Sequence, residues 1–195
     1  MLFRSPAVMK KVAYEITGKD YLPYFTETVL FSSDLLSSLS ELHHMIMHEE
    51  KDFKKEEILL LIIEQLIAEY DHAGAALTTQ PPNTEIKAVC DFLENNYMKS
   101  ITLNDLSDLT GISKYYLLCS FTKQKGISPY CYLETIRIGN AKKLLEQQIA
   151  PIDVALQTGF TDQSHFTNFF KKLIGLTPKQ YMNIFTEGSR RSGNE

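Results

Sequence analysis

The stretch Leu106–Tyr132, LSDLTGISKYYLLCSFTKQKGISPYCY, decides the fold, because the chain repeats it at Val154–Tyr181, VALQTGFTDQSHFTNFFKKLIGLTPKQY. Gly111 matches Gly159, 48 residues further on, whereas the later matches are 49 residues apart. One residue inserted just after Gly159 explains the change. Two copies are too few for a solenoid, so the sequence predicts one structural unit that occurs twice. The later matches are Leu117 and Phe166, Phe121 and Phe170, Gly126 and Gly175, Ser128 and Thr177, Pro129 and Pro178, and Tyr132 and Tyr181.

Each copy has the pattern of two helices joined by a tight turn. In the first copy, Gly111 supplies the left-handed backbone that ends a short helix, while Thr102 and Ser113 are placed to cap the two helices. Leu117 and Phe121 are four residues apart and form the buried stripe of the second helix. A small residue, a glycine and then an apolar pair suit two helices that cross steeply, so each copy is predicted to be a helix-turn-helix. The second copy has these features at Val154, Ala155, Gly159, Phe166 and Phe170.

Charge is divided unevenly along the chain. Residues 1–82 carry 7 Lys and Arg against 13 Asp and Glu, a net charge of −6, and residues 83–195 carry 13 against 11, a net charge of +2. A polyanionic partner is therefore expected to bind the C-terminal half. With 44% apolar and 23% charged residues, the 195-residue chain is expected to fold as one large domain or two small ones.

Sequence signals of other protein classes are weak. Three cysteines without a Cys-x-x-Cys spacing favour reduced thiols in a cytoplasmic protein. No signal peptide is recognisable, and the longest apolar run, residues 58–68, is interrupted by Glu64 and Gln65 and is too short to span a membrane. His44 and His48 have a metal-ligand spacing but no third ligand nearby. No spacing suggests a catalytic set, so we expect no enzyme activity, metal or cofactor.

The sequence predicts an all-α chain in four parts. A long amphipathic helix, residues 129–147, is expected to join the two helix-turn-helix units and to fix their separation. Thr26–Phe31 alternates loosely, as an extended segment would. The parts are a helical N-terminal segment at 1–74, a linker at 75–84, a double helix-turn-helix domain at 85–185 and a flexible tail at 186–195.

One predicted helix, Glu56–Tyr70, is apolar on almost every side and must be covered on several of them. Residues 1–82 are few for that task, so we expect a homodimer through residues 34–71. The alternative is that the helix predicted at 34–49 and the aromatic N-terminus provide the cover. The residues expected at the dimer contact are Leu59, Ile62, Ile63 and Leu66.

A family pattern extends over about a hundred residues, 85–185. Its members are Leu106, Ser107, Gly111, Ser113, Tyr116, Leu117, Phe121, Gly126, Ile127, Ser128, Tyr132, Leu133, Arg137, Ala141, Leu144, Leu145, Ile152, Val154, Ala155, Gly159, Phe160, Phe166, Phe170, Lys171, Lys172, Gly175, Thr177 and Pro178. In these positions the chain resembles the DNA-binding domain of the AraC/XylS family of bacterial transcription regulators. The resemblance implies a regulator that places the second helix of each unit in successive major grooves of double-stranded DNA. It also implies activation of transcription, which is the commoner role in the family, with RNA polymerase as a further partner.

Residues 18–71 resemble, more weakly, the end of the sensor domain that often precedes this DNA-binding domain. In such relatives a β-barrel comes first and holds the effector, and the dimerising helices would correspond to residues 34–71. This sequence has no such barrel, so either the chain begins late or it lacks an effector pocket.

The resemblance places base contacts on the outer faces of the two second helices. Leucine and cysteine offer bases only apolar contact, whereas glutamine and asparagine can form paired hydrogen bonds with adenine. Cys119 and Asn168 stand where relatives often carry arginine. We therefore predict that the second copy reads most bases, although Leu118 could instead pack on the long helix, and the polar face of the second copy could be merely solvated. The expected base contacts are Tyr115, Leu118, Cys119, Gln163, Ser164, His165, Thr167 and Asn168.

Phosphate contacts are expected where helices begin and where lysines follow them. Arg137, on the long helix, is predicted to pair with Asp153 or Asp162. A different class of function also fits the sequence, namely a truncated interaction protein that pairs with a full-length relative and modulates it. The expected phosphate contacts are Ser113, Lys114, Lys123, Lys171 and Lys172.

Overall fold

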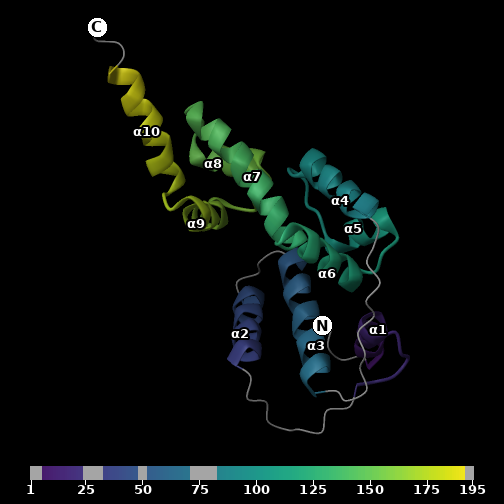
Figure 1. Cartoon of the computed structure of the whole chain (residues 1–195). Coiled ribbons are helices and arrows are strands. Elements are labelled where there is room, and N and C mark those ends of the chain that lie inside the picture. The colour runs from purple at the N-terminus through teal and green to yellow at the C-terminus, as the bar shows by residue number, and fades with distance from the viewer. Residues whose placement is uncertain (1–5, 24–32, 48–51, 71–82, 192–195) are drawn as a thin grey trace. The chain divides into compact units, whose positions relative to one another are not determined.

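The computed structural model describes residues 6–23, 33–47, 52–70 and 83–191, and all regular structure in these ranges is helical (Figure 1). The all-α prediction is therefore confirmed for the described residues. The extended segment predicted at 26–31 and most of the linker predicted at 75–84 lie outside them. The helices are α1 (Pro6–Thr17), α2 (Ser33–Met47), α3 (Asp52–Tyr70), α4 (Asn83–Asn96), α5 (Leu103–Thr110), α6 (Lys114–Lys125), α7 (Pro129–Glu146), α8 (Pro151–Gln157), α9 (Gln163–Ile174) and α10 (Pro178–Arg191).

The two sequence copies form two helix-turn-helix units, α5–α6 and α8–α9, as predicted. The Thr102 side chain caps α5 and forms a reciprocal capping box with Asp105. Ser113 caps α6 by accepting from the Tyr116 backbone N–H, and Asp162 caps α9 by accepting from the His165 backbone N–H. α5, α6 and α9 each end at a glycine in the left-handed conformation.

The chain divides into two compact units. The N-terminal unit contains Met1–Cys90 and Thr102–Tyr130, and the C-terminal unit contains Asp91–Ile101 and Cys131–Glu195. The first helix-turn-helix therefore belongs to the same unit as α1–α3, whereas the second belongs to the other unit.

In the N-terminal unit, α3 packs against several other helices. One side packs on α2, where Ile62 of α3 meets Leu35 and Leu42. Further cover comes from α1 and α5, which also pack on α3. The Phe53 ring of α3 packs edge-on against Tyr130, with ring centres 5.7 Å apart. The chain thus covers much of this apolar helix itself. The other buried apolar side chains of α3 are Leu60, Ile63 and Ile67.

In the C-terminal unit, α9 is anchored by two phenylalanines. Phe166 and Phe170 are fully buried in a core shared with α7 and α8, which contribute Leu145 and Val154 among others. Gly159, between α8 and α9, has a φ of +81°, and a Cβ there would lie 2.8 Å from the carbonyl oxygens of Tyr97 and Met98. Among the described residues, no helix combines the length and apolar character that crossing a membrane requires.

Candidate nucleic-acid interface

The outer face of α9 is polar and accessible. Phe166 and Phe170 face inward, and the other positions of the first half of the helix carry amide, hydroxyl and imidazole groups. The Gln163, Ser164 and Asn168 side chains are exposed, and His165 and Thr167 are half-buried. These groups can donate and accept hydrogen bonds, as reading base edges in a groove requires.

The His165 side chain packs against two aromatic rings. Its ring lies 5.5 Å from that of Phe160 and 6.5 Å from that of Phe169, measured between ring centres. Lys171 and Lys172, near the end of the same helix, are both exposed. The second helix-turn-helix therefore places its predicted base-contact and phosphate-contact residues on one short helix.

The outer face of α6 is different, because other helices of the N-terminal unit cover it. Leu117 and Phe121 are buried as predicted, but Tyr115 and Leu118 are also buried, with 8% and 0% of their surface exposed. The expectation that Tyr115 and Leu118 face outward is wrong for this arrangement of the unit. Cys119 is half-buried. Base contact by these three residues stays a prediction, and it would require the covering helices to move.

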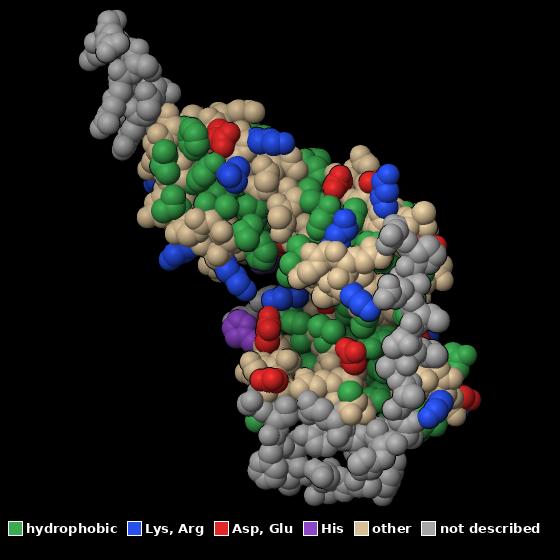
Figure 2. Space-filling model, viewed as in Figure 1, with side chains coloured by type: hydrophobic (Ala, Val, Ile, Leu, Met, Phe, Trp, Pro, Cys, Tyr) green, Lys and Arg blue, Asp and Glu red, His purple; other side chains and the backbone are tan. Residues whose placement is uncertain are grey.

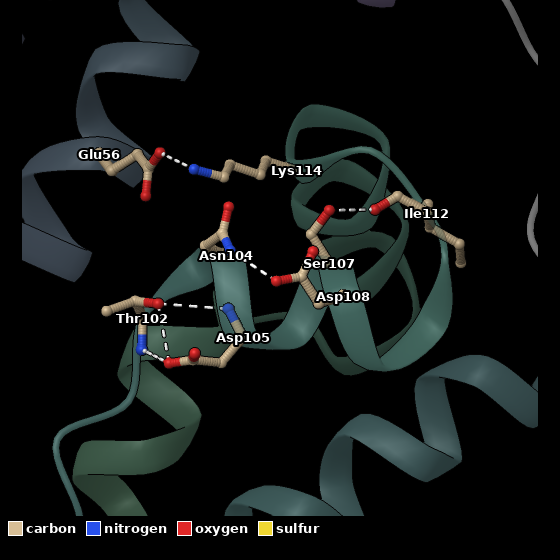
Figure 3. Close-up of polar contacts among 8 residues, drawn as sticks. All are labelled: Glu56, Thr102, Asn104, Asp105, Ser107, Asp108, Ile112 and Lys114. Atoms are coloured by element: carbon tan, nitrogen blue, oxygen red, sulfur yellow. Dashed lines mark hydrogen bonds and ion pairs between the residues drawn. The ribbon is translucent and has the colours of Figure 1, made fainter.

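α1 packs on α6, and α3 reaches α6 through two carboxylates. The Lys114 Nζ lies 2.7 Å from Glu56 Oε1 (Figure 3), and the Tyr115 hydroxyl donates to Glu64 Oε1 at 2.7 Å. Burial raises the pKa of Tyr115 far above its usual value, and the hydrogen bond to Glu64 raises it further. Burial also raises the pKa of the Cys119 thiol. The tyrosine is therefore a neutral hydrogen-bond donor in this position.

A third carboxylate of α3 is used at the start of α7. Glu57 is 3% exposed and accepts hydrogen bonds from the Ser128 hydroxyl at 2.6 Å and the Tyr130 backbone N–H at 2.8 Å. It thereby satisfies a backbone donor that the first turn of α7 leaves unpaired. Burial raises the pKa of Glu57 to about 7, against the opposing effect of these hydrogen bonds.

The remaining predicted phosphate contacts are placed as follows. Ser113 is half-buried and occupied in capping α6, and Lys123 is exposed on the last turn of that helix.

No group of three or more His, Cys, Asp or Glu side chains suited to a metal ion occurs in the described part of the chain.

These geometric features agree with known proteins. A family model described as a helix-turn-helix domain matches residues 106–184. The structure is similar to that of a probable AraC family transcriptional regulator from Rhodopseudomonas palustris, with a TM-score of 0.50, 26% sequence identity, and coverage of 53% of this chain and 98% of that one. The chain carries a DNA-binding domain of the AraC type.

Two relatives match more than half of this chain and more than half of their own length. The HTH-type transcriptional regulator YbfI of Bacillus subtilis is 55% identical over 160 residues, which cover 82% of this chain and 58% of that protein. The bifunctional transcriptional activator and DNA repair enzyme AdaA of Bacillus subtilis is 28% identical over 116 residues, which cover 59% of this chain and 55% of AdaA. The chain therefore spans less than two thirds of the length of these relatives.

The residues predicted to dimerise this AraC-type chain lie largely inside it. Ile62 and Ile63 are buried, and Leu59 and Leu66 are half-buried beside α2. Sequence periodicity could not reveal this packing, because it shows that a helix is apolar all round but not which element covers each side.

Arg137, a position of the family pattern, has a partner that the sequence reasoning missed. It pairs with Glu134, three residues earlier on α7, and not with Asp153 or Asp162. The i, i+3 spacing of two opposite charges on one helix was the signal that could have found it.

Proposed function

We propose that this AraC-type chain binds double-stranded DNA in a sequence-specific way and acts as a transcription regulator in the cytoplasm. The observation that carries the proposal is the accessible polar face of α9, which stands on the second copy of a duplicated helix-turn-helix. A major groove admits one such helix, and glutamine and asparagine can pair with adenine there. The exposed lysines at the end of α9 supply cations for nearby phosphates.

Readout is divided unequally between the two units. α9 reads most bases, while α6, whose outer face is apolar and covered, mainly positions the protein in the neighbouring groove once that face is free. Two helices in one chain can bridge successive grooves, which recur about every 34 Å on one face of DNA.

Regulation is in the direction of activation, and RNA polymerase is the expected partner. The printed name of the relative AdaA includes transcriptional activator, which supports this direction. A homodimer through residues 34–71 belongs to the same proposal. Ile62 and Ile63 are buried within the chain, so a second copy would contact other apolar side chains. Those exposed in the described part of residues 34–71 are Leu36, Leu39, Ile46 and Met47 on α2 and Leu61 on α3.

Selection of bound duplexes from a random pool tests the proposal directly. We expect an enriched site, and binding to it should fall linearly in log affinity with log salt, because lysine–phosphate contacts release counterions. A scrambled duplex of equal length and composition is the control. Absence of both enrichment and salt-dependent binding would refute the proposal and favour the truncated interaction protein.

A further inference from the structure

The N-terminal helix α3 occupies the residues of α6 that would approach DNA. Lys114, a predicted phosphate contact, is paired with Glu56, and Tyr115, a predicted base contact, donates to Glu64. These partners are 58 and 51 residues apart in sequence, so the contacts are tertiary and not a local property of the helix-turn-helix. Leu118, one turn further along α6, has no exposed surface, and α1 also packs on α6.

The contacting residues of α3 form one stripe. Glu56, Leu60 and Glu64 are spaced i, i+4 and i+8, so they lie on the same side of the helix. Leu60, between the two carboxylates, is buried. The two carboxylates of this stripe, four residues on either side of Leu60, reach the Lys114 ammonium and the Tyr115 hydroxyl in the first turn of α6.

The charge of α3 resembles that of the ligand it would displace. Glu56 accepts from the ammonium that a phosphate oxygen would use, and Glu64 occupies the hydroxyl that is predicted to contact a base. Acidic side chains (red) also lie over the N-terminal helices in Figure 2, in keeping with the net charge of −6 on residues 1–82. A DNA backbone approaching α6 would meet carboxylates where it needs cations.

We propose that α3 is an intramolecular competitor of DNA, which docks on the outer face of α6 and closes the first helix-turn-helix until DNA or another partner displaces it. This inference rests on the proposed DNA-binding function. The contact can be displaced easily, because partly exposed ion pairs are weak. The Lys114 and Glu56 side chains retain 31% and 33% exposure. α9 is not part of the contact, so the second helix-turn-helix can engage DNA first.

Neutralising the two docking carboxylates should open α6. The full chain with Glu56→Gln and Glu64→Gln is compared with the wild type and with a matched control, Asp20→Asn and Glu41→Gln. The control removes the same charge from the N-terminal segment, but its two acids pair with Lys10 and Lys54 and not with α6. If the closed form holds about nine tenths of the molecules, opening tightens the apparent affinity for the selected duplex by about tenfold. The control should change it less than twofold, as order of magnitude.

A DNA-free measurement follows the docking itself. In a Cys131→Ser background, which removes the exposed thiol, Cys119 is the half-buried thiol on α6, and Cys90 is buried. A maleimide should label Cys119 several-fold faster in the Glu56→Gln, Glu64→Gln variant than in the control, with unchanged helical circular dichroism.

The two measurements separate the possible failures. Faster labelling together with tighter DNA binding supports the inference. Unchanged labelling shows that α3 does not dock through these acids, and faster labelling with unchanged affinity shows that docking does not oppose DNA. Either of these results overturns the inference while the proposed function stands. If no variant binds the duplex at all, the proposed function fails and the inference fails with it.

Discussion

Arg137 donates from Nη1 to Glu134 Oε1 at 2.9 Å, and both side chains are almost wholly buried, with 1% and 0% exposed. The guanidinium also donates to the backbone carbonyls of Tyr97 and Lys99, at 2.8 and 2.9 Å, just beyond the end of α4. One buried cation thus ties α7 to the segment that leaves α4. Because each charge is desolvated, removing one partner leaves the other unpaired in the interior.

Arg137→Ala is therefore expected to destabilise the chain by about 3–5 kcal/mol, measured as the free energy of unfolding in urea. The double change Arg137→Met and Glu134→Leu removes both charges and should cost less than the single change. A single change that costs under about 1 kcal/mol would show that Glu134 is not left as an uncompensated buried charge.

Alanine at two glycines should have unequal effects. Both Gly111 and Gly159 have positive φ, +70° and +81°. Alanine in this left-handed backbone conformation is strained by about 1–2 kcal/mol at either position. At Gly111 the added Cβ meets nothing within 4 Å, whereas at Gly159 it meets backbone oxygens at 2.8 Å, which cannot move cheaply. We expect Gly159→Ala to lower the thermal midpoint clearly more than Gly111→Ala. Equal shifts would mean that the close approach to Tyr97 and Met98 relaxes freely.

The local features of the fold were predictable from the sequence, because they depend on residues close in the chain. Thr102 and Ser113 cap the helices expected of them, and Leu117, Phe121, Phe166 and Phe170 face inward, as their four-residue spacing indicates. Leu109, which shares a helix face with Leu106 by spacing, is exposed, because the buried pair of α5 is Leu103 and Leu106. Periodicity identifies a face but not how far along the helix its cover extends.

The parts that could not be predicted depend on contacts between distant segments. Nothing in the α6 sequence specifies that Glu64 accepts from Tyr115, or that Leu118 is covered. A hint was present, since leucine and cysteine on a supposed DNA-reading face offer bases no strong hydrogen bond. The polar face of α9 carried no such conflict, and its predicted residues are accessible or half-buried.

Stability should fall as pH rises toward neutrality, because of Glu57. Its pKa is raised from 4.5 in the unfolded reference to about 7 in the folded chain, so the folded state holds a proton that the unfolded state releases between these values. The stabilising contribution is fully present below about pH 4.5 and is lost as pH rises through about 7, with an upper limit of about 3 kcal/mol. Urea midpoints measured at pH 5, 6, 7 and 8 test this, and Glu57→Gln should flatten the profile in that window. A Glu41→Gln control should keep it.

Phosphate anchoring by α9 predicts a change in salt dependence. Replacing Lys171 or Lys172 by alanine should weaken binding about equally for all duplex sequences and reduce the slope of log affinity against log salt by about 1 for each lysine in contact. Lys87, exposed on α4, is the matched control and should leave the slope unchanged. A slope that is insensitive to both α9 lysines would mean that phosphates are held elsewhere.

The division of readout between the two units predicts different outcomes for Gln163 and Leu118. Gln163 is exposed on the outer face of α9, so Gln163→Ala should relax base preference at its position by about 1–3 kcal/mol without lowering stability. Leu118 is fully buried, so Leu118→Ala should instead lower the free energy of unfolding, by about 2–5 kcal/mol for a core leucine. Gln147→Ala, at an exposed position just past α7, is the control for loss of an amide. Base preference is measured by competition among single-base variants of the selected duplex. A greater relaxation of base preference from Leu118→Ala than from Gln163→Ala would place the main reading helix at α6 and not at α9.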